Sequence, residues 1–231
     1  MTIPQASPAL LQADDLVIGY PGQVLCGPLQ LAVQPGSGLG IIGANGSGKS
    51  TLLRTVLGEL APVQGCVQFN SLPLNPDALL FRRDVAVQVT DGAFFEELSV
   101  AEHLELAARG HRVADWQQAV GREIEFFDLA PVAGKLPAEL SSGQRRKLLL
   151  AAALVRPARL LILDEPEQRL DLRIRQRLYE RLAALRAEGT GILVVSHDPL
   201  LLRSCLSQTL LLDGDEGQLL EAGQGAQWLE R

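Results

Sequence analysis

The residue types and spacing of a phosphate-binding loop, G-x-x-x-x-G-K-[ST], occur in the segment Gly43-Ala44-Asn45-Gly46-Ser47-Gly48-Lys49-Ser50-Thr51. Its glycines allow a tight turn whose N–H groups face one point, and the N-terminal end of a following helix adds positive charge there. The Lys49 ammonium can then contact the β- and γ-phosphates of a nucleotide, and the Ser50 hydroxyl can bind Mg²⁺. The pattern predicts a nucleotide site.

The chain on either side of this loop predicts the two elements that the chemistry needs. An apolar run at 39–42 comes directly before the loop, and a helical pattern at 52–57 comes directly after it. A strand, a glycine loop and a helix in this order form the context in which the pattern binds phosphate. A glycine turn that binds nothing would not need Gly, Lys and Ser at every required offset.

Two consecutive carboxylates, Asp164 and Glu165, follow a second apolar run at 160–163. Such a run is typical of a strand buried on both faces, and ligands bind at the C-terminal ends of parallel strands. There Asp164 can hold Mg²⁺, directly or through water, and Glu165 can polarise a water aimed at the γ-phosphate. The alternative is a solvated turn after the strand.

A third segment, Leu140-Ser141-Ser142-Gly143-Gln144, places small and hydroxyl residues at the start of a predicted helix. A helix N-terminus of this kind can bind an anion. The same serines are also ordinary N-cap residues, which satisfy backbone N–H groups without any ligand. The segment alone therefore leaves both interpretations open.

Length and composition exclude several classes of protein. A chain of 231 residues with 47% hydrophobic residues fits one large domain, or a core with a subdomain. The net charge of −6 argues against a nucleic-acid-binding protein. Three scattered cysteines indicate a reduced, cytosolic protein without a structural metal. No apolar run approaches a membrane span, and 1–8 has no signal-peptide pattern, so we expect a short arm there.

The predicted elements form an α/β core interrupted by helices. We expect the core at 1–89 and 156–231, and a helical insertion at about 90–155 that begins with a Ser99–Glu102 capping box. The expected strands lie at about 14–35, 39–42, 67–69, 85–89, 160–163 and 192–195, and the expected later helices at 116–127, 148–155 and 171–188.

The order of these motifs resembles that of the ATP-binding cassette (ABC) ATPase family from about residue 14 to 212. A phosphate loop, a lone Gln, Leu-Ser-x-Gly-Gln, an apolar strand ending in Asp-Glu, and a later His follow one another. The resemblance implies a P-loop NTPase fold, that is, a RecA-like core with a mixed sheet, an N-terminal antiparallel β region and an inserted helical subdomain that carries Leu-Ser-x-Gly-Gln. It also implies that 1–231 is a single ABC ATPase domain with ATP and Mg²⁺ as cofactors.

The resemblance assigns roles to residues outside the loop. Tyr20 matches the aromatic residue that stacks on adenine. Gln88 matches the glutamine that senses Mg²⁺ and the γ-phosphate. Asp164 and Glu165 match the metal carboxylate and the catalytic base, and His197 matches the histidine that contacts the γ-phosphate. Taken singly, each position is more ordinary: a turn tyrosine, an edge glutamine or a capping histidine.

Other matched positions concern a second subunit. Ser141, Ser142, Gly143 and Gln144 match the signature that contacts ATP held by the partner, and Asp171 matches the aspartate of the D-loop. Two departures face that partner. Ser142 replaces a usual Gly, and Gln168-Arg169-Leu170-Asp171 replaces Ser-Ala-Leu-Asp. Because the residues that do chemistry are kept, we expect an active ATPase with an altered interface.

The resemblance thus implies the ATP-hydrolysing motor subunit of an ABC transporter. It would act as a homodimer or pseudo-dimer, bind no nucleic acid, and sit in the cytoplasm on the inner face of the membrane beside an integral-membrane subunit. The short C-terminal tail favours export. A soluble ABC ATPase without a transport role, such as an iron–sulfur assembly factor, is the alternative. A third possibility is a nucleotide-dependent binding module that does not hydrolyse ATP, but the presence of Glu165 and His197 speaks against it.

Two further features carry predictions. Phe94 and Phe95 are adjacent in a polar loop soon after Gln88, so at least one should lie near the surface. The resemblance places them at the groove that receives the membrane subunit, and the alternative is a role in the small core of the insertion. Arginines recur every fourth residue from Arg169 to Arg181, which we interpret as a solvated helix face and not as a nucleic-acid site.

Overall fold

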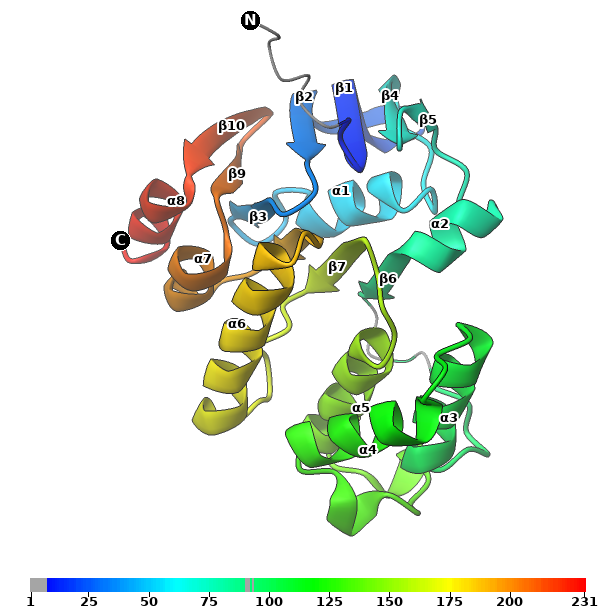
Figure 1. The fold of residues 1–231 in the computed structure, drawn as a ribbon. Helices are drawn as coiled ribbons and strands as arrows, with labels where there is room; N and C mark the ends of the chain where they lie inside the picture. Colours follow the sequence, from blue (N-terminus) through cyan, green and yellow to red (C-terminus); the bar gives the residue numbers. More distant parts are fainter. Residues whose placement is uncertain (1–7, 90–91, 93) are drawn as a thin grey trace, which may run out of the picture.

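The computed structural model describes residues 8–89, 92 and 94–231. Residues 1–7 of the arm predicted at 1–8 lie outside the described residues, as does Asp91 in the loop before Phe94. The chain forms two sheets with helices between and around them (Figure 1). Among the described residues, no helix combines the length and apolarity needed to cross a bilayer.

The first sheet is antiparallel and consists of β1 (Leu11–Tyr20), β2 (Gln23–Val33), β4 (Gln64–Phe69) and β5 (Leu72–Pro73), in the order β2-β1-β4-β5. Alternate residues of β2 are buried, namely Leu29, Leu31 and Val33. This is the period of a strand with one face on a core. The predicted N-terminal antiparallel β region is confirmed.

The second sheet has six strands in the order β10-β9-β3-β8-β7-β6. Four were expected: β3 (Gly38–Gly43), β6 (Val85–Gln88), β7 (Leu160–Asp164) and β8 (Gly191–Val195), and all their pairings are parallel. β9 (Gln208–Asp213) and β10 (Glu216–Glu221) add an antiparallel hairpin that the sequence pattern did not reveal. The predicted mixed sheet is therefore confirmed.

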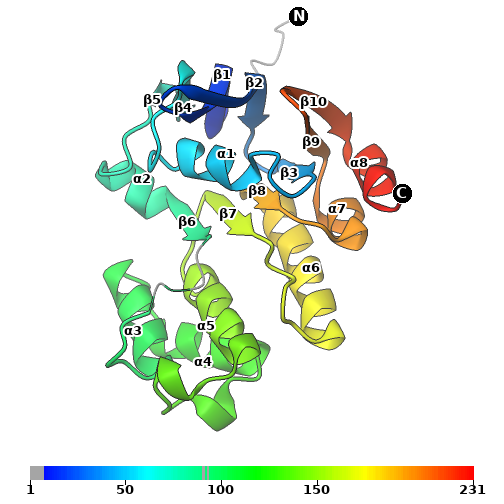
Figure 2. The same ribbon diagram turned by 180° about the vertical axis from the view of Figure 1, so that it is seen from behind.

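Helix α1 (Lys49–Val56) lies between the two sheets, as both views show (Figures 1 and 2). Its Leu52 and Leu53 join a core to which Ile162 of β7 also contributes. The residues on either side of Ile162 in β7, Leu161 and Leu163, belong to a second core on the other face of the sheet. That core takes in α6 (Leu172–Ala187), α7 (Pro199–Cys205) and α8 (Ala222–Leu229). Burial on both faces explains the unbroken apolar run of β7.

The remaining α-helices of the described residues are α2 (Leu79–Asp84), α3 (Val100–Gly110), α4 (Trp116–Phe126) and α5 (Ser142–Leu154). Helices α3, α4 and α5 lie together on one side of the molecule and are called the helical group below (Figure 1). The predicted capping box at the start of α3 is present, because the Ser99 hydroxyl and the Glu102 carboxylate satisfy each other's backbone N–H groups. The exact division of the chain into core and helical subdomain stays a prediction.

The arginine stripe from Arg169 to Arg181 is only partly the solvated face that we expected, because Arg169 and Arg173 are exposed whereas Arg177 and Arg181 are half-buried. Arg173 pairs with Asp128, and Arg181 forms two bonds to Glu123 at 2.7 and 2.6 Å. The guanidinium groups of Arg177 and Arg181 also lie 4.5 and 4.9 Å from the ring centre of Phe126. The sequence showed the charges of α6 but not their acidic and aromatic partners on and after α4. The stripe therefore joins α6 to the helical group.

Candidate functional site

The loop between β3 and α1 has the tight backbone that the glycine spacing predicts. Gly43, Gly46 and Gly48 have φ angles of 151°, 84° and 98°, a region that side chains rarely allow. A Cβ atom on Gly43 would lie 2.4 Å from the carbonyl oxygen of Leu212. The loop conformation therefore depends on glycine at these positions.

The Lys49 ammonium points back into this loop. It donates hydrogen bonds to the carbonyl oxygens of Gly43 and Ala44 at 2.8 and 2.9 Å. Burial lowers the pKa of Lys49, and the nearby charges of Glu165 and Asp164 oppose this shift. A buried cation held by two backbone carbonyls can exchange those neutral acceptors for phosphate oxygens, which are stronger partners.

Asp164 and Glu165 stand at the C-terminal end of β7. The Glu165 N–H donates to the Val195 carbonyl oxygen at 2.8 Å, which ties the ends of β7 and β8 together. Burial, together with the charge of Glu165, raises the pKa of Asp164 to about 6, while the charges of Arg146 and Lys49 oppose the shift. Two adjacent carboxylates that repel each other in a half-buried place suit a divalent cation.

Glu165 and His197 face each other from neighbouring strand ends. The His197 Nε2 atom lies 3.4 Å from the Glu165 Oε1 atom, and both side chains are partly exposed. Glu165 has a left-handed backbone, with φ 46°, and Gln168 donates its amide to the second carboxylate oxygen. The structure thus brings together two residues that lie far apart in the sequence, beside the loop that holds Lys49.

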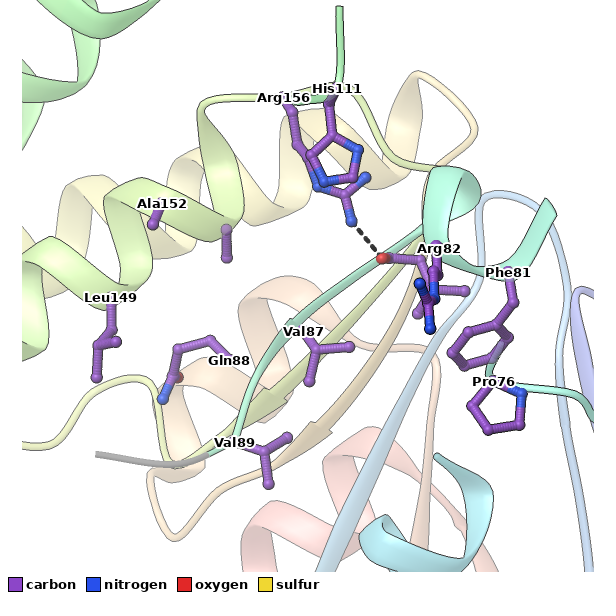
Figure 3. Close-up of a pocket in the computed structure, with 12 residues that line it drawn as sticks. Pro76, Phe81, Arg82, Val87, Gln88, Val89, His111, Leu149, Ala152 and Arg156 are labelled. Carbon is purple, nitrogen blue, oxygen red and sulfur yellow. Dashed lines mark hydrogen bonds between the residues drawn. The ribbon is translucent and has the colours of Figure 1, made fainter. Parts of the chain in front are cut away.

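Gln88, at the end of β6, is buried, and only 3% of it is exposed. Its amide nitrogen and oxygen have no hydrogen-bond partner within the described part of the chain. The side chain lines a pocket of about 580 Å³ between β6 and α5, which Leu149 and Arg156 also line (Figure 3). An unsatisfied buried amide is costly, so this position calls for a partner that the chain itself does not supply.

The predicted signature forms the start of α5 and satisfies its own N-terminus. The Ser141 hydroxyl accepts from the Gln144 N–H at 3.2 Å, and the Gln144 side chain accepts from the Ser141 N–H at 2.9 Å. The capping interpretation is therefore correct, and it does not exclude an anion at the same helix end. Ser142 lines a pocket together with Arg145 and Arg169, so the two departures from the family pattern lie side by side.

Asp171 caps α6, since its carboxylate accepts from the Ile174 N–H at 3.0 Å. It also accepts from the Lys147 ammonium of α5 at 3.1 Å. The backbone bond from Ile174, helped by Lys147, lowers the pKa of Asp171. Asp171 therefore holds the turn after β7 against the helix that carries the signature.

Tyr20 ends β1 and is 40% exposed. A Cβ atom on Gly48 would lie 3.1 Å from the Cδ1 atom of Ile18, two residues earlier in the same strand. The end of β1 is thus close to the phosphate loop, where an exposed aromatic ring can stack on a base.

Sequence patterns did not reveal one buried acid next to His197. Glu167 is 6% exposed, and its Oε1 atom accepts from the Ser196 hydroxyl at 2.7 Å and from the His197 N–H at 3.1 Å. The signal available was a third acid in Asp164-Glu165-Pro166-Glu167. Nothing in that spacing tells which of the three carboxylates turns inward.

Comparison with known proteins identifies the family. A family model described as ABC transporter matches residues 26–168, which is more than half of the chain. The chain belongs to the ABC transporter family. A second model, described as an AAA domain with a putative AbiEii toxin of a type IV toxin–antitoxin system, matches residues 134–203.

Two curated relatives represent opposite directions of transport. A putative 2-aminoethylphosphonate import ATP-binding protein of Salmonella choleraesuis is 33% identical over 80% of this chain and 51% of its own length. A Nod factor export ATP-binding protein of Cupriavidus metallidurans is 35% identical over 82% of this chain and 63% of its own length. The chain spans about half the length of the first relative, and the similarity favours neither direction.

Solved structures agree with the fold. A structure described as the ATP-binding subunit of an ABC transporter has a TM-score of 0.84 and 28% identity, covering 96% of this chain and 93% of the other. A dimeric ATP-binding cassette with ADP and phosphate in a post-hydrolysis state has a TM-score of 0.81 at 21% identity, covering 92% and 98%. The predicted ABC-type P-loop fold is confirmed.

Proposed function

We propose that this chain hydrolyses ATP with Glu165 as the general base and drives a separate membrane subunit of a transporter. The observation that carries the proposal is the meeting of Glu165 and His197, 3.4 Å apart, at the strand ends next to Lys49. Such a pair provides both a base for a water molecule and a donor for the γ-phosphate. The family of the chain supports the same reaction.

Each residue has a separate task in this proposal. The N–H groups of 43–51 and the Lys49 ammonium hold the β- and γ-phosphates, while Tyr20 stacks on the adenine. Glu165 takes a proton from the attacking water, and His197 donates to the γ-phosphate. Gln88 offers its unsatisfied amide to the γ-phosphate.

Mg²⁺ fits the donors present. Among the described residues there is no group of three or more His, Cys, Asp or Glu side chains that could hold a metal alone. Mg²⁺ characteristically binds through one or two carboxylates and completes its shell with other oxygen donors, phosphates and water. Asp164, the Ser50 hydroxyl and the Gln88 amide oxygen would supply those protein donors. When bound, the ion neutralises phosphate charge during transfer.

A second ABC domain would complete the site. We propose that Ser141 to Gln144 of one subunit contact the ATP held by 43–51 of the other, with Asp171 next to them. The helix N-terminus at Ser141 keeps the positive end that such a contact needs. Ser142 and Arg169 share one pocket, so they would alter this interface together.

The proposed membrane partner places the chain on the cytoplasmic side of a membrane. The similarity to import and export ATP-binding proteins supports a transport role. A non-transport ABC ATPase, for example one for iron–sulfur assembly, is the competing assignment. Detergent extraction of native membranes followed by affinity capture separates the two, because only transport requires an integral-membrane protein in stoichiometric amount.

The reaction is tested with two variants and a control. Lys49→Ala should lose ATP binding, because the phosphates lose their mobile cation. Glu165→Gln should bind ATP, release almost no phosphate, and elute as an ATP-dependent dimer on size exclusion, because an amide is no base. Glu180→Gln, on the exposed face of α6, should behave as wild type. Normal phosphate release by Glu165→Gln would refute the assignment of the base.

A further inference from the structure

The segment that carries His197 is a short stretch between β8 and α7, and a single oxygen atom holds most of it. The Oε1 atom of Glu167 accepts from the Ser196 hydroxyl at 2.7 Å and from the His197 N–H at 3.1 Å. The Ser196 Oγ atom in turn accepts from the Asp198 N–H at 3.0 Å. Three consecutive residues are therefore fixed, directly or through one hydroxyl, by the Glu167 carboxylate.

The burial of Glu167 strengthens its hydrogen bonds with Ser196 and His197. Ser196 is completely buried, and Glu167 is 6% exposed. Desolvation raises the pKa of Glu167, while the bonds from Ser196 and His197 oppose that shift. A carboxylate is rarely buried without such bonds, and hydrogen bonds to a charged acceptor are about twice as strong as neutral ones.

The far side of the same segment is fixed as well. The Asp198 carboxylate accepts from the Tyr179 hydroxyl at 2.7 Å and caps α7 through the Leu200 N–H. The Arg175 guanidinium lies 3.5 Å from it. His197 therefore sits between two anchors, one on α6 and one at Glu167, and only its side chain is left partly free.

Glu167 also belongs to the turn that carries Glu165. The two residues are separated by Pro166 alone, and the Gln168 N–H donates to the Glu165 carbonyl oxygen at 3.0 Å within that turn. The backbone of Glu167 is thus part of the turn that holds Glu165, whereas its side chain holds the His197 segment. This geometry connects the two residues that face each other at 3.4 Å.

We propose that Glu167 is a positioning residue for hydrolysis, which keeps the His197 imidazole opposite the Glu165 carboxylate. The inference rests on the proposed roles of Glu165 and His197. A misplacement of about 1 Å at a reacting centre can cost up to about 100-fold in rate. Loss of the Glu167 contact should therefore affect turnover far more than nucleotide binding.

The test compares Glu167→Leu, which removes the acceptor, with Glu167→Gln, which keeps a carbonyl oxygen at the same place. Glu167→Leu should lower kcat about 10-fold or more with little change in the Kd for ATP, and Glu167→Gln should restore most of the rate. In a His197→Ala background, Glu167→Leu should add little. An equal loss in both backgrounds, or an unchanged kcat, would refute the positioning role.

Two further variants and one further measurement distinguish the possible outcomes. Glu180→Leu, at an exposed position of α6, controls for the loss of a carboxylate, and Ser196→Ala gives a milder form of the same change if Glu167→Leu fails to fold. Hydrogen exchange of the His197 amide, measured without nucleotide, should speed up in Glu167→Leu and not in Glu167→Gln. If the His197 amide of Glu167→Leu exchanges as slowly as in the wild type, the positioning role is contradicted. If the wild type itself does not hydrolyse ATP, only the proposed function is contradicted.

Discussion

At the scale of single residues, Asp164 shows how function and stability oppose each other in this site. Its carboxyl group is half-buried beside Glu165, and burial raises its pKa from 3.8 to about 6. The folded chain thus keeps this proton to a higher pH than the unfolded chain does. The stabilisation linked to the proton is complete below about pH 4 and is lost as the pH rises through about 6. At neutral pH, Asp164 is a charged group that destabilises the free protein.

Asp164→Asn should therefore unfold at a higher temperature than wild type at pH 7.5 when Mg²⁺ and nucleotide are absent. The difference in Tm should shrink as the pH falls through 6 toward 5, because wild type regains its proton. Thermal unfolding at several pH values measures it. Asp213→Asn, at the exposed end of β9, is the control. Added Mg·ATP should stabilise wild type more than Asp164→Asn, and a pH-independent difference would show that burial is not the cause.

At the same scale, the sequence predicted most of the candidate site. The loop 43–51 and the acids after β7 could be found because their spacing is short and chemically specific. Glu167 could not, since burial of one acid among three depends on Ser196 and His197, about 30 residues later. Local spacing predicts which groups share a turn, but only the packed chain decides which of them faces inward.

At the scale of elements, patterns predicted the strands better than the contacts between helices. The run 160–163 identified β7 because a central parallel strand is apolar on both faces. The β9–β10 hairpin was missed, since β10 is an edge strand on which four of the six residues are exposed and no apolar run marks it. The partners of the α6 arginines were missed, because a helix pattern reveals a charged face but not the neighbouring groups that it contacts.

The contact between α6 and α4 gives a stability prediction. The Arg181–Glu123 pair is double and largely buried, with side chains 24% and 4% exposed. Arg181→Met leaves the Glu123 charge unpaired, so it should lower the free energy of unfolding by about 3 kcal/mol. Arg173→Met breaks an exposed pair with Asp128 and should cost less than about 1 kcal/mol.

Equilibrium unfolding in guanidinium chloride measures both variants. Adding Glu123→Leu to Arg181→Met should recover part of the loss, because the buried unpaired charge is then removed as well. If Arg181→Met costs no more than Arg173→Met, the pair does not join α6 to the helical group.

At the scale of the whole molecule, Phe94 and Phe95 are adjacent in the sequence but differ in burial. Phe94 is partly buried against the large apolar core that includes Val100 and Leu104 of α3, whereas Phe95 is 61% exposed. His103 fixes this arrangement: its Nε2 atom accepts from the Phe95 N–H at 2.9 Å, and its Nδ1–H donates to the Ser99 carbonyl oxygen at 2.9 Å. The expectation that at least one ring lies near the surface is met by Phe95, and Phe94 partly fits the alternative core role.

The two rings should therefore behave differently when the chain assembles with a membrane subunit. Phe95→Ala removes an exposed ring, so Tm should stay near wild type, while co-purification with the membrane protein that wild type captures should fall, since exposed aromatics commonly anchor interfaces. Phe94→Ala should lower Tm, because truncating a packed aromatic ring leaves a cavity. Leu106→Ala, at a 46% exposed site on α3, should change neither quantity. If Phe95→Ala captures the membrane protein as well as wild type does, the partner binds elsewhere on the chain.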